Sequence, residues 1–218
     1  MGIPRPPAAV LPDTADTRLL IELTSHANDL SEAAQALDCA LTSGEDSALW
    51  MPLTSHAVTA YIRPFIDSNV RTRLDKMSMV PPIPAHLQAV HDLIRNYRNT
   101  TVAHSQSTLV MPLPVAILDD QGKGVDVMGV SLTHQMPLAL AEGLSDLIGT
   151  VEDIVEEATQ PVLDRLRTWL KGQDATAIGS WQLPVINEAL DADFTSAHRR
   201  KRTPQFTMYW RTWEQERP

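Results

Sequence analysis

The chain has 218 residues, 43% of them hydrophobic, and contains a single cysteine. This length fits one domain with additions or two small domains, and one cysteine excludes an intramolecular disulfide framework and every cysteine-based zinc cluster. The net charge of −9 is uneven, because the residues from His198 onward carry +4 and the preceding 197 carry −13. An acidic body is a poor general binder of nucleic acid, so a basic tail would act only locally.

The first 13 residues contain four prolines and no apolar core. We therefore predict an extended N-terminal arm over residues 1–13 and no signal peptide. The longest apolar stretch, Leu109 to Leu118, is too short to span a bilayer and contains two prolines. With the single cysteine, which favours a reducing compartment, these features predict a cytoplasmic protein that makes no membrane contact.

Three segments before residue 105 have apolar residues at helical spacing. They predict helices from about residue 14 to 41, from about 48 to 67 and from about 85 to 104. Cys39 lies among alanines in the first of them, which predicts a small packing residue and not a nucleophile. The proline-rich segment 68–84 predicts short helical structure at most.

The period of the apolar pattern changes to two at about residues 107–133, which predicts an inserted β-hairpin. Pro112 and Pro114 fall on the same side of its first strand, so that strand is expected to be a sheet edge. Gly129 predicts an irregularity in the second strand.

A long helix is predicted from Pro137 to about Gly172, with a kink at Pro161. Its acidic residues lack the Glu-x-x-His pairing of di-metal helical bundles, so we predict no metal site and no cofactor. The residues from 173 to 218 predict an irregular, basic and aromatic C-terminal extension.

The third predicted helix ends in a group of polar residues, in which Arg98 is followed by Asn99 and, after five intervening residues, by His104. The preceding helix carries an aromatic–Arg–aromatic segment, Tyr61 to Phe65. This arrangement resembles the R-x(4–6)-H signature of the HEPN superfamily, and in particular its abortive-infection branch. The superfamily is an all-α group common in bacterial toxin–antitoxin and phage-defence systems.

The resemblance covers about residues 15–172 and implies a mainly α, HEPN-like helical bundle over residues 14–172 with the hairpin as an insertion. It implies a metal-independent endoribonuclease of a toxin or phage-defence system, acting as a homodimer with a composite site. In this interpretation His104 is the acid and base, Arg98 stabilises the phosphate and Asn99 assists it. Six residues along an α-helix separate Arg98 and His104 by about 120°, so both reach one phosphate only through a symmetric partner or a frayed helix end near Ala103.

Further residues are candidate RNA contacts. Arg95 and His91 share a helix face with Arg98 by their spacing. The tail combines aromatic residues with cations, which suits single-stranded RNA. Its candidate RNA-binding residues are Arg199, Arg200, Lys201 and Arg202.

Several alternatives remain open at this stage. His104 is also favoured at a helix C-terminus by the helix dipole, Arg98 could pair with an acidic residue, and Arg95 and His91 could lie on a solvated face. The basic tail could fold back onto the acidic body. The chain could be a non-catalytic HEPN-like sensor or regulatory protein that binds an antitoxin or a defence-system partner. A third alternative is an unrelated helical bundle that binds nucleic acid through its tail.

Overall fold

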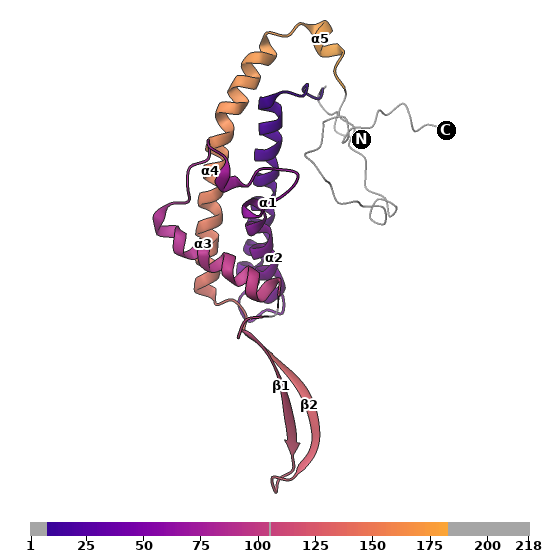
Figure 1. The fold of residues 1–218 in the computed structure, drawn as a ribbon, viewed down its shortest axis with the longest axis vertical. Coiled ribbons are helices and arrows are strands. Elements are labelled where there is room, and N and C mark those ends of the chain that lie inside the picture. The colour runs from indigo at the N-terminus through magenta and orange to yellow at the C-terminus, as the bar shows by residue number, and fades with distance from the viewer. Residues whose placement is uncertain (1–7, 105, 183–218) are drawn as a thin grey trace, which may run out of the picture. The chain divides into compact units, whose positions relative to one another are not determined.

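The computed structural model describes residues 8–104 and 106–182. These residues are mainly helical and include one two-stranded antiparallel sheet, as predicted (Figure 1). The helices are α1 (Ala15–Ser43), α2 (Trp50–Ile62), α3 (Ala85–Tyr97), α4 (Leu138–Lys171) and α5 (Ala175–Gly179), and the strands are β1 (Val110–Leu118) and β2 (Gly124–Thr133). Short 3-10 helices at Arg63–Phe65 and Leu74–Lys76 and a π-helix at Arg98–Val102 complete the described elements. No helix in the described ranges is both long and apolar enough to cross a membrane.

The chain divides into two compact units. The described residues of unit 1 are 8–25, 66–80 and 155–182, and those of unit 2 are 26–65, 81–104 and 106–154. Helices α1 and α4 each contribute residues to both units. The hairpin and the Arg98–His104 segment belong to unit 2, which therefore carries the candidate site.

The core of unit 2 is built from one face of each of its helices. Leu87 and Ile94 of α3 are buried at the positions that the periodicity predicts. The fully buried Trp50 donates its indole N–H to the Met136 carbonyl over 2.7 Å, which joins the start of α2 to the segment before α4. The other large, fully buried side chains of this unit are Leu30, Leu37, Tyr61, Ile62, Met136, Leu144, Leu147 and Ile148.

Unit 1 joins the start of α1 to the second half of α4 and to the segment 66–80. Arg165 pairs with Asp16 at 2.6 Å. The extension after α4 begins with α5, a helix that the sequence analysis did not predict; Asp174 caps it by accepting the Ala177 amide at 2.7 Å. The remainder of the predicted extension, with Arg199, Arg200, Lys201 and Arg202, and residues 1–7 of the predicted arm lie outside the described residues.

Three local predictions need correction. Helix α2 ends at Ile62 and not near residue 67, because Pro64 cannot donate the next helical hydrogen bond and Arg63–Phe65 form a 3-10 turn. Cys39 was predicted to pack among alanines, but it is exposed. The third predicted helix stops being α-helical at Tyr97, seven residues early, and continues as the π-helix.

The hairpin follows the predicted strands but not the predicted irregularity. Gly129 pairs regularly with Pro114, and the register shift lies instead between Ile117 and Leu118, beside a turn in which Gly122 adopts a φ of 78°. The amide of His134 donates to the Leu109 carbonyl at 2.8 Å, so these two residues form a hydrogen-bonded pair of the antiparallel ladder. Because hydrogen-bonded and non-hydrogen-bonded pairs alternate along the strands, the backbone nitrogens of Pro112 and Pro114 point away from β2. Within the described residues β1 pairs with β2 alone, so the edge-strand prediction is confirmed.

Candidate functional site

Helix α3 is fixed to α2 by a buried aromatic group. The Tyr61 hydroxyl and Nδ1 of His91 are 2.7 Å apart, and the Phe65 ring packs edge-on against His91 with centroids 4.7 Å apart. Burial raises the pKa of Tyr61 far above its ordinary value, so its hydroxyl keeps its proton. The His91 residue is only 5% exposed, so it belongs to the core and lies neither at an RNA-contacting surface nor on a solvated helix face.

At the predicted motif α3 continues as the π-helix Arg98–Val102, which we call the π-turn. The Ala103 amide donates to the Arg98 carbonyl over 2.9 Å, five residues back, and the Thr100 hydroxyl donates to the Asn96 carbonyl at 2.9 Å. The chain then folds back, because the amides of Gln106 and Ser107 both donate to the Thr100 carbonyl. His104 therefore lies outside the helix, and the 120° separation expected of an ideal α-helix does not apply.

This turn leaves the three predicted catalytic residues on one short, solvent-accessible segment. His104 and Asn99 are exposed, and Arg98 is partly exposed. One guanidinium nitrogen of Arg98 donates to Oδ1 of Asn99 at 3.2 Å, while its Nε is buried without a hydrogen-bond partner. No carboxylate among the described residues forms an ion pair with Arg98 or with the exposed Arg95. The alternative in which Arg98 pairs with an acidic residue is thus not seen in this part of the chain.

A cleft of about 770 Å³ lies beside the turn, and the sequence pattern did not predict it. Neither Arg98 nor His104 lines it. Its polar lining comes from α3, from the turn and from the segment after β2, and consists of Asn96, Tyr97, Thr100, Thr101, Ser107, Thr108, His134 and Gln135. Its apolar lining includes Leu93, Leu109 and Leu140.

The polar groups that line this cleft are hydroxyls, side-chain amides and the imidazole of His134. Thr101 donates its hydroxyl to Ser107 at 2.8 Å, which holds the two walls of the turn together. Burial raises the pKa of Tyr97, so its hydroxyl remains a donor. Such a lining can hydrogen-bond a neutral polar group, with the apolar residues covering one side of it. His134 reaches the cleft because the hairpin returns the chain to the helices. No local sequence pattern therefore predicts that His134 lines the cleft.

The acidic face of α4 has no metal-ligating geometry. The pKa of Glu152 is raised by burial and by the neighbouring Asp153. In the described part of the chain no group of three or more His, Cys, Asp or Glu side chains is placed to hold a metal ion.

The comparisons with known proteins add no relative. No protein-family model, no curated protein and no solved structure matches this chain.

Proposed function

We propose that the chain is a HEPN-type endoribonuclease of a toxin or phage-defence system, which cleaves RNA as a homodimer without a metal ion. The observation that carries the proposal is the π-turn with the two residues that follow it. This segment combines Arg98, which pairs with no carboxylate among the described residues, with the exposed His104. The π-turn lies at the C-terminal end of α3, directly before His104. In this proposal Arg98, Asn99 and His104 form the catalytic half-site of each copy.

The reaction needs only proton transfer and charge stabilisation. The ribose 2′-oxygen attacks phosphorus, the bond from phosphorus to the 5′-oxygen breaks, and the products are a 2′,3′-cyclic phosphate and a 5′-hydroxyl. One neutral imidazole accepts the 2′-hydroxyl proton, and one protonated imidazole supplies the proton to the leaving 5′-oxygen. The guanidinium of Arg98 is always charged, and its planar donors match the phosphate oxygens on which negative charge builds up.

In this proposal a second copy completes the site, because one group must accept a proton while another group donates one. His104 is the only histidine on the turn, so the second imidazole is assigned to His104 of a second copy. Arg95, exposed on the last turn of α3, is proposed to add positive charge for the flanking phosphates. The basic residues 199–202 remain proposed RNA contacts outside the described residues.

The test is cleavage of end-labelled RNA in excess chelator by the intact chain, His104→Ala and Arg98→Ala. His86, exposed in the first turn of the same helix, provides a matched control as His86→Ala. We expect His104→Ala and Arg98→Ala to lose about 100-fold or more in rate, as is usual for a group in proton transfer or phosphate stabilisation, and His86→Ala to retain the rate. The products should end in 2′,3′-cyclic phosphate.

Unchanged cleavage by His104→Ala would refute the assignment. A folded dimer that binds RNA but leaves it intact would instead support the alternative of a non-catalytic sensor or regulatory protein with a defence-system or antitoxin partner. Because His104 is exposed, His104→Ala is not expected to unfold the chain, and circular dichroism of Arg98→Ala checks the fold of that variant, in which a partly buried side chain is lost.

A further inference from the structure

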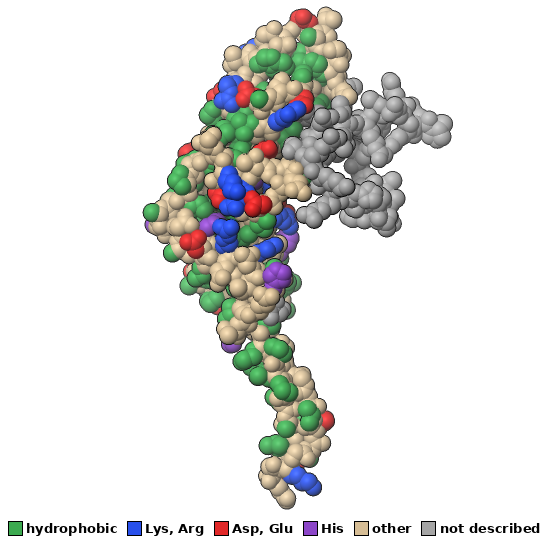
Figure 2. Space-filling view, viewed as in Figure 1, with side chains coloured by type: hydrophobic (Ala, Val, Ile, Leu, Met, Phe, Trp, Pro, Cys, Tyr) green, Lys and Arg blue, Asp and Glu red, His purple; other side chains and the backbone are tan. Residues whose placement is uncertain are grey.

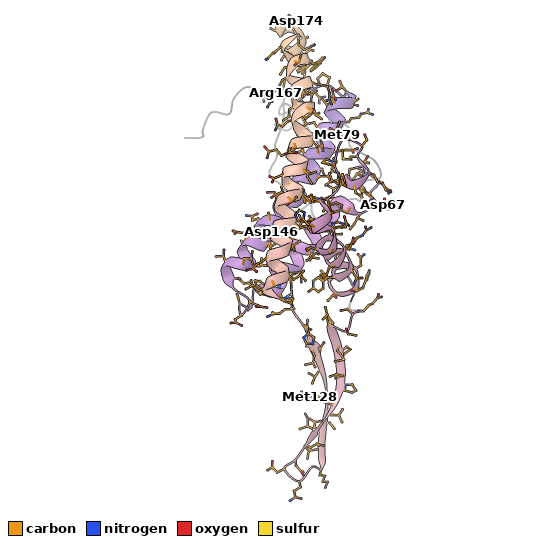
Figure 3. The ribbon with its side chains drawn as sticks, turned by 90° about the vertical axis from the view of Figure 1, so that its left-hand side faces the viewer. Asp67, Met79, Met128, Asp146, Arg167 and Asp174 are labelled. Atoms are coloured by element: carbon orange, nitrogen blue, oxygen red, sulfur yellow. The ribbon has the colours of Figure 1, made fainter. Side chains whose placement is uncertain are left out.

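The cleft beside the π-turn has the size of a small-molecule site and is formed by one compact unit. Its volume of about 770 Å³ lies within the range of about 300–1,000 Å³ that is usual for such sites. All its lining residues belong to unit 2, and they meet at the base of the hairpin, where Leu109 precedes β1 and His134 follows β2. Met128, labelled in Figure 3, lies on the hairpin between this base and the tip.

Several side chains of the cleft offer hydrogen-bonding groups that the fold does not use. Within the described residues no hydrogen bond is made by the Asn96 amide, the Tyr97 and Thr108 hydroxyls or the His134 imidazole. Asn96 and Tyr97 come from α3, whereas Thr108 and His134 come from the two segments that flank the hairpin. Polar groups from separate segments therefore converge on one space, as they do in ligand sites.

The rest of the lining is apolar and accessible. Leu93 and Leu109 are 48% and 38% exposed, and Leu140 of α4 is half-buried. A ligand that fits both parts of the lining needs an apolar surface to cover these leucines and a polar edge to meet the unused donors and acceptors. A nucleobase has both, since its flat faces stack on apolar and aromatic side chains while its edges carry hydrogen-bonding groups.

The charges around the cleft favour the base of a nucleotide over its phosphate. No Lys, Arg, Asp or Glu is among the described residues that line it. On the face drawn in Figure 2, no Lys or Arg side chain lies along the hairpin between its base and its tip. A phosphate inside the cleft would lose water without gaining a permanent cation. Arg95 and Arg98 are the chain neighbours of Asn96 and Tyr97 but do not line the cleft, so they supply cations outside it.

We propose that the cleft binds one unstacked base of a single-stranded RNA, with the phosphates of that strand outside it. The faces of the base contact the leucines and the Tyr97 ring, and its edge exchanges hydrogen bonds with Asn96 and the hydroxyls. Sequence-specific recognition of single-stranded RNA commonly uses such contacts. The choice of RNA as the source of the base rests on the proposed function, because a free nucleoside presents the same chemistry. The inference adds a base-binding site beside a turn that is otherwise proposed to act on the phosphate.

Saturation-transfer-difference NMR of the full chain with adenosine, cytidine, guanosine and uridine tests the cleft itself. These probes carry no phosphate, so their binding does not depend on the arginines. The perturbing variants are Asn96→Ala and Leu93→Ala, both at exposed positions, and the matched control is Gln88→Ala, an exposed amide of α3 outside the cleft. We expect at least one nucleoside to bind with a dissociation constant of about 0.1–10 mM. Each cleft variant should raise that constant about 3- to 10-fold, because it loses a hydrogen bond or an apolar contact, and Gln88→Ala should leave it within about twofold.

A second measurement distinguishes RNA from a free nucleoside as the source of the base. Fluorescence anisotropy is followed during titration of a labelled single-stranded 2′-O-methyl RNA of about ten nucleotides, a length within the usual site size of single-strand binders. Its methylated 2′-oxygens cannot attack phosphorus, so binding is measured without cleavage. We expect Asn96→Ala and Leu93→Ala to weaken RNA binding about 3- to 10-fold, as for the nucleoside, and Gln88→Ala to leave it unchanged.

Three results would overturn the proposal. The first is no saturation transfer to any nucleoside, and the second is nucleoside binding that neither cleft variant weakens, which would place that binding elsewhere. The third is RNA affinity that neither cleft variant changes although nucleoside binding is weakened, which would assign the cleft to a free nucleoside. Both binding measurements are independent of cleavage, so a failed base site and a failed catalytic site are distinguishable.

Discussion

The hydrogen bond between Tyr61 and His91 is expected to be the main polar interaction that holds α3 on α2. Tyr61 is fully buried, and its hydroxyl lies 2.7 Å from Nδ1 of His91. In Tyr61→Phe the ring contact with Phe65 is kept, but His91 loses this partner inside the core. Loss of one partner of a buried hydrogen bond costs about 1–3 kcal/mol, so we expect the free energy of unfolding to fall by about 2 kcal/mol.

The assay is equilibrium unfolding in urea, followed by far-ultraviolet circular dichroism. Tyr97→Phe is the matched control, because the hydroxyl of Tyr97 makes no hydrogen bond within the described residues. We expect that control to change the free energy of unfolding by less than about 0.5 kcal/mol. The two tyrosines lie on neighbouring helices of the same unit, so both variants report on one folding unit.

A double-mutant cycle decides whether the bond itself is responsible. In His91→Phe the edge contact with Phe65 can be kept, and the Tyr61 hydroxyl loses its partner. When both changes are combined, the loss should be smaller than the sum of the single losses by about 1 kcal/mol or more. Strictly additive losses, or a Tyr61→Phe variant as stable as the parent chain, would show that this hydrogen bond does not stabilise the fold as argued.

Two further predictions concern unit 2. Trp50→Phe removes the donor to the Met136 carbonyl and leaves a cavity, so the free energy of unfolding in urea should fall by about 2–4 kcal/mol; a fall below about 1 kcal/mol would contradict the importance of this bond. Arg63, which donates to Glu32 at 2.6 Å, lowers the pKa of Glu32. The carboxylate therefore stabilises the fold at neutral pH, and this contribution disappears as the pH falls through the lowered pKa. The difference in melting temperature between the parent chain and Glu32→Gln should accordingly become smaller as the pH is lowered. A difference that does not change with pH would refute this stabilising role of the Glu32 carboxylate.

Local pattern was sufficient to predict most helices and the hairpin. Helix α1 spans Ala15–Ser43 where residues 14–41 were predicted, and α4 spans Leu138–Lys171 where 137–172 were predicted. Long periodic segments carry their signal in their own side chains, so tertiary contacts are not needed to recognise them. The edge position of β1 was predictable for the same reason, since it depends on the backbone of Pro112 and Pro114.

Features set by distant contacts were not predictable. The spacing of His91 from Arg95 and Arg98 suggested a common surface, but burial of the His91 ring depends on Tyr61 and Phe65 from another helix. The cleft was missed because His134 reaches it only through the fold of the hairpin. α5 was missed because it is only five residues long and begins at one capping residue, Asp174, without a periodic pattern.

The π-turn departs from regular α-helical structure for an identifiable reason, and it coincides with the motif of Arg98, Asn99 and His104. Thr100, Thr101 and Val102 are β-branched residues, which fit poorly into a regular helical turn. The Thr100 carbonyl accepts the amides of Gln106 and Ser107, which offsets the loss of regular helical hydrogen bonding. A sequence that favoured stability alone would continue the α-helix with better helix formers. In the proposed function this break matters because it takes His104 off the helix while Arg98 stays on it.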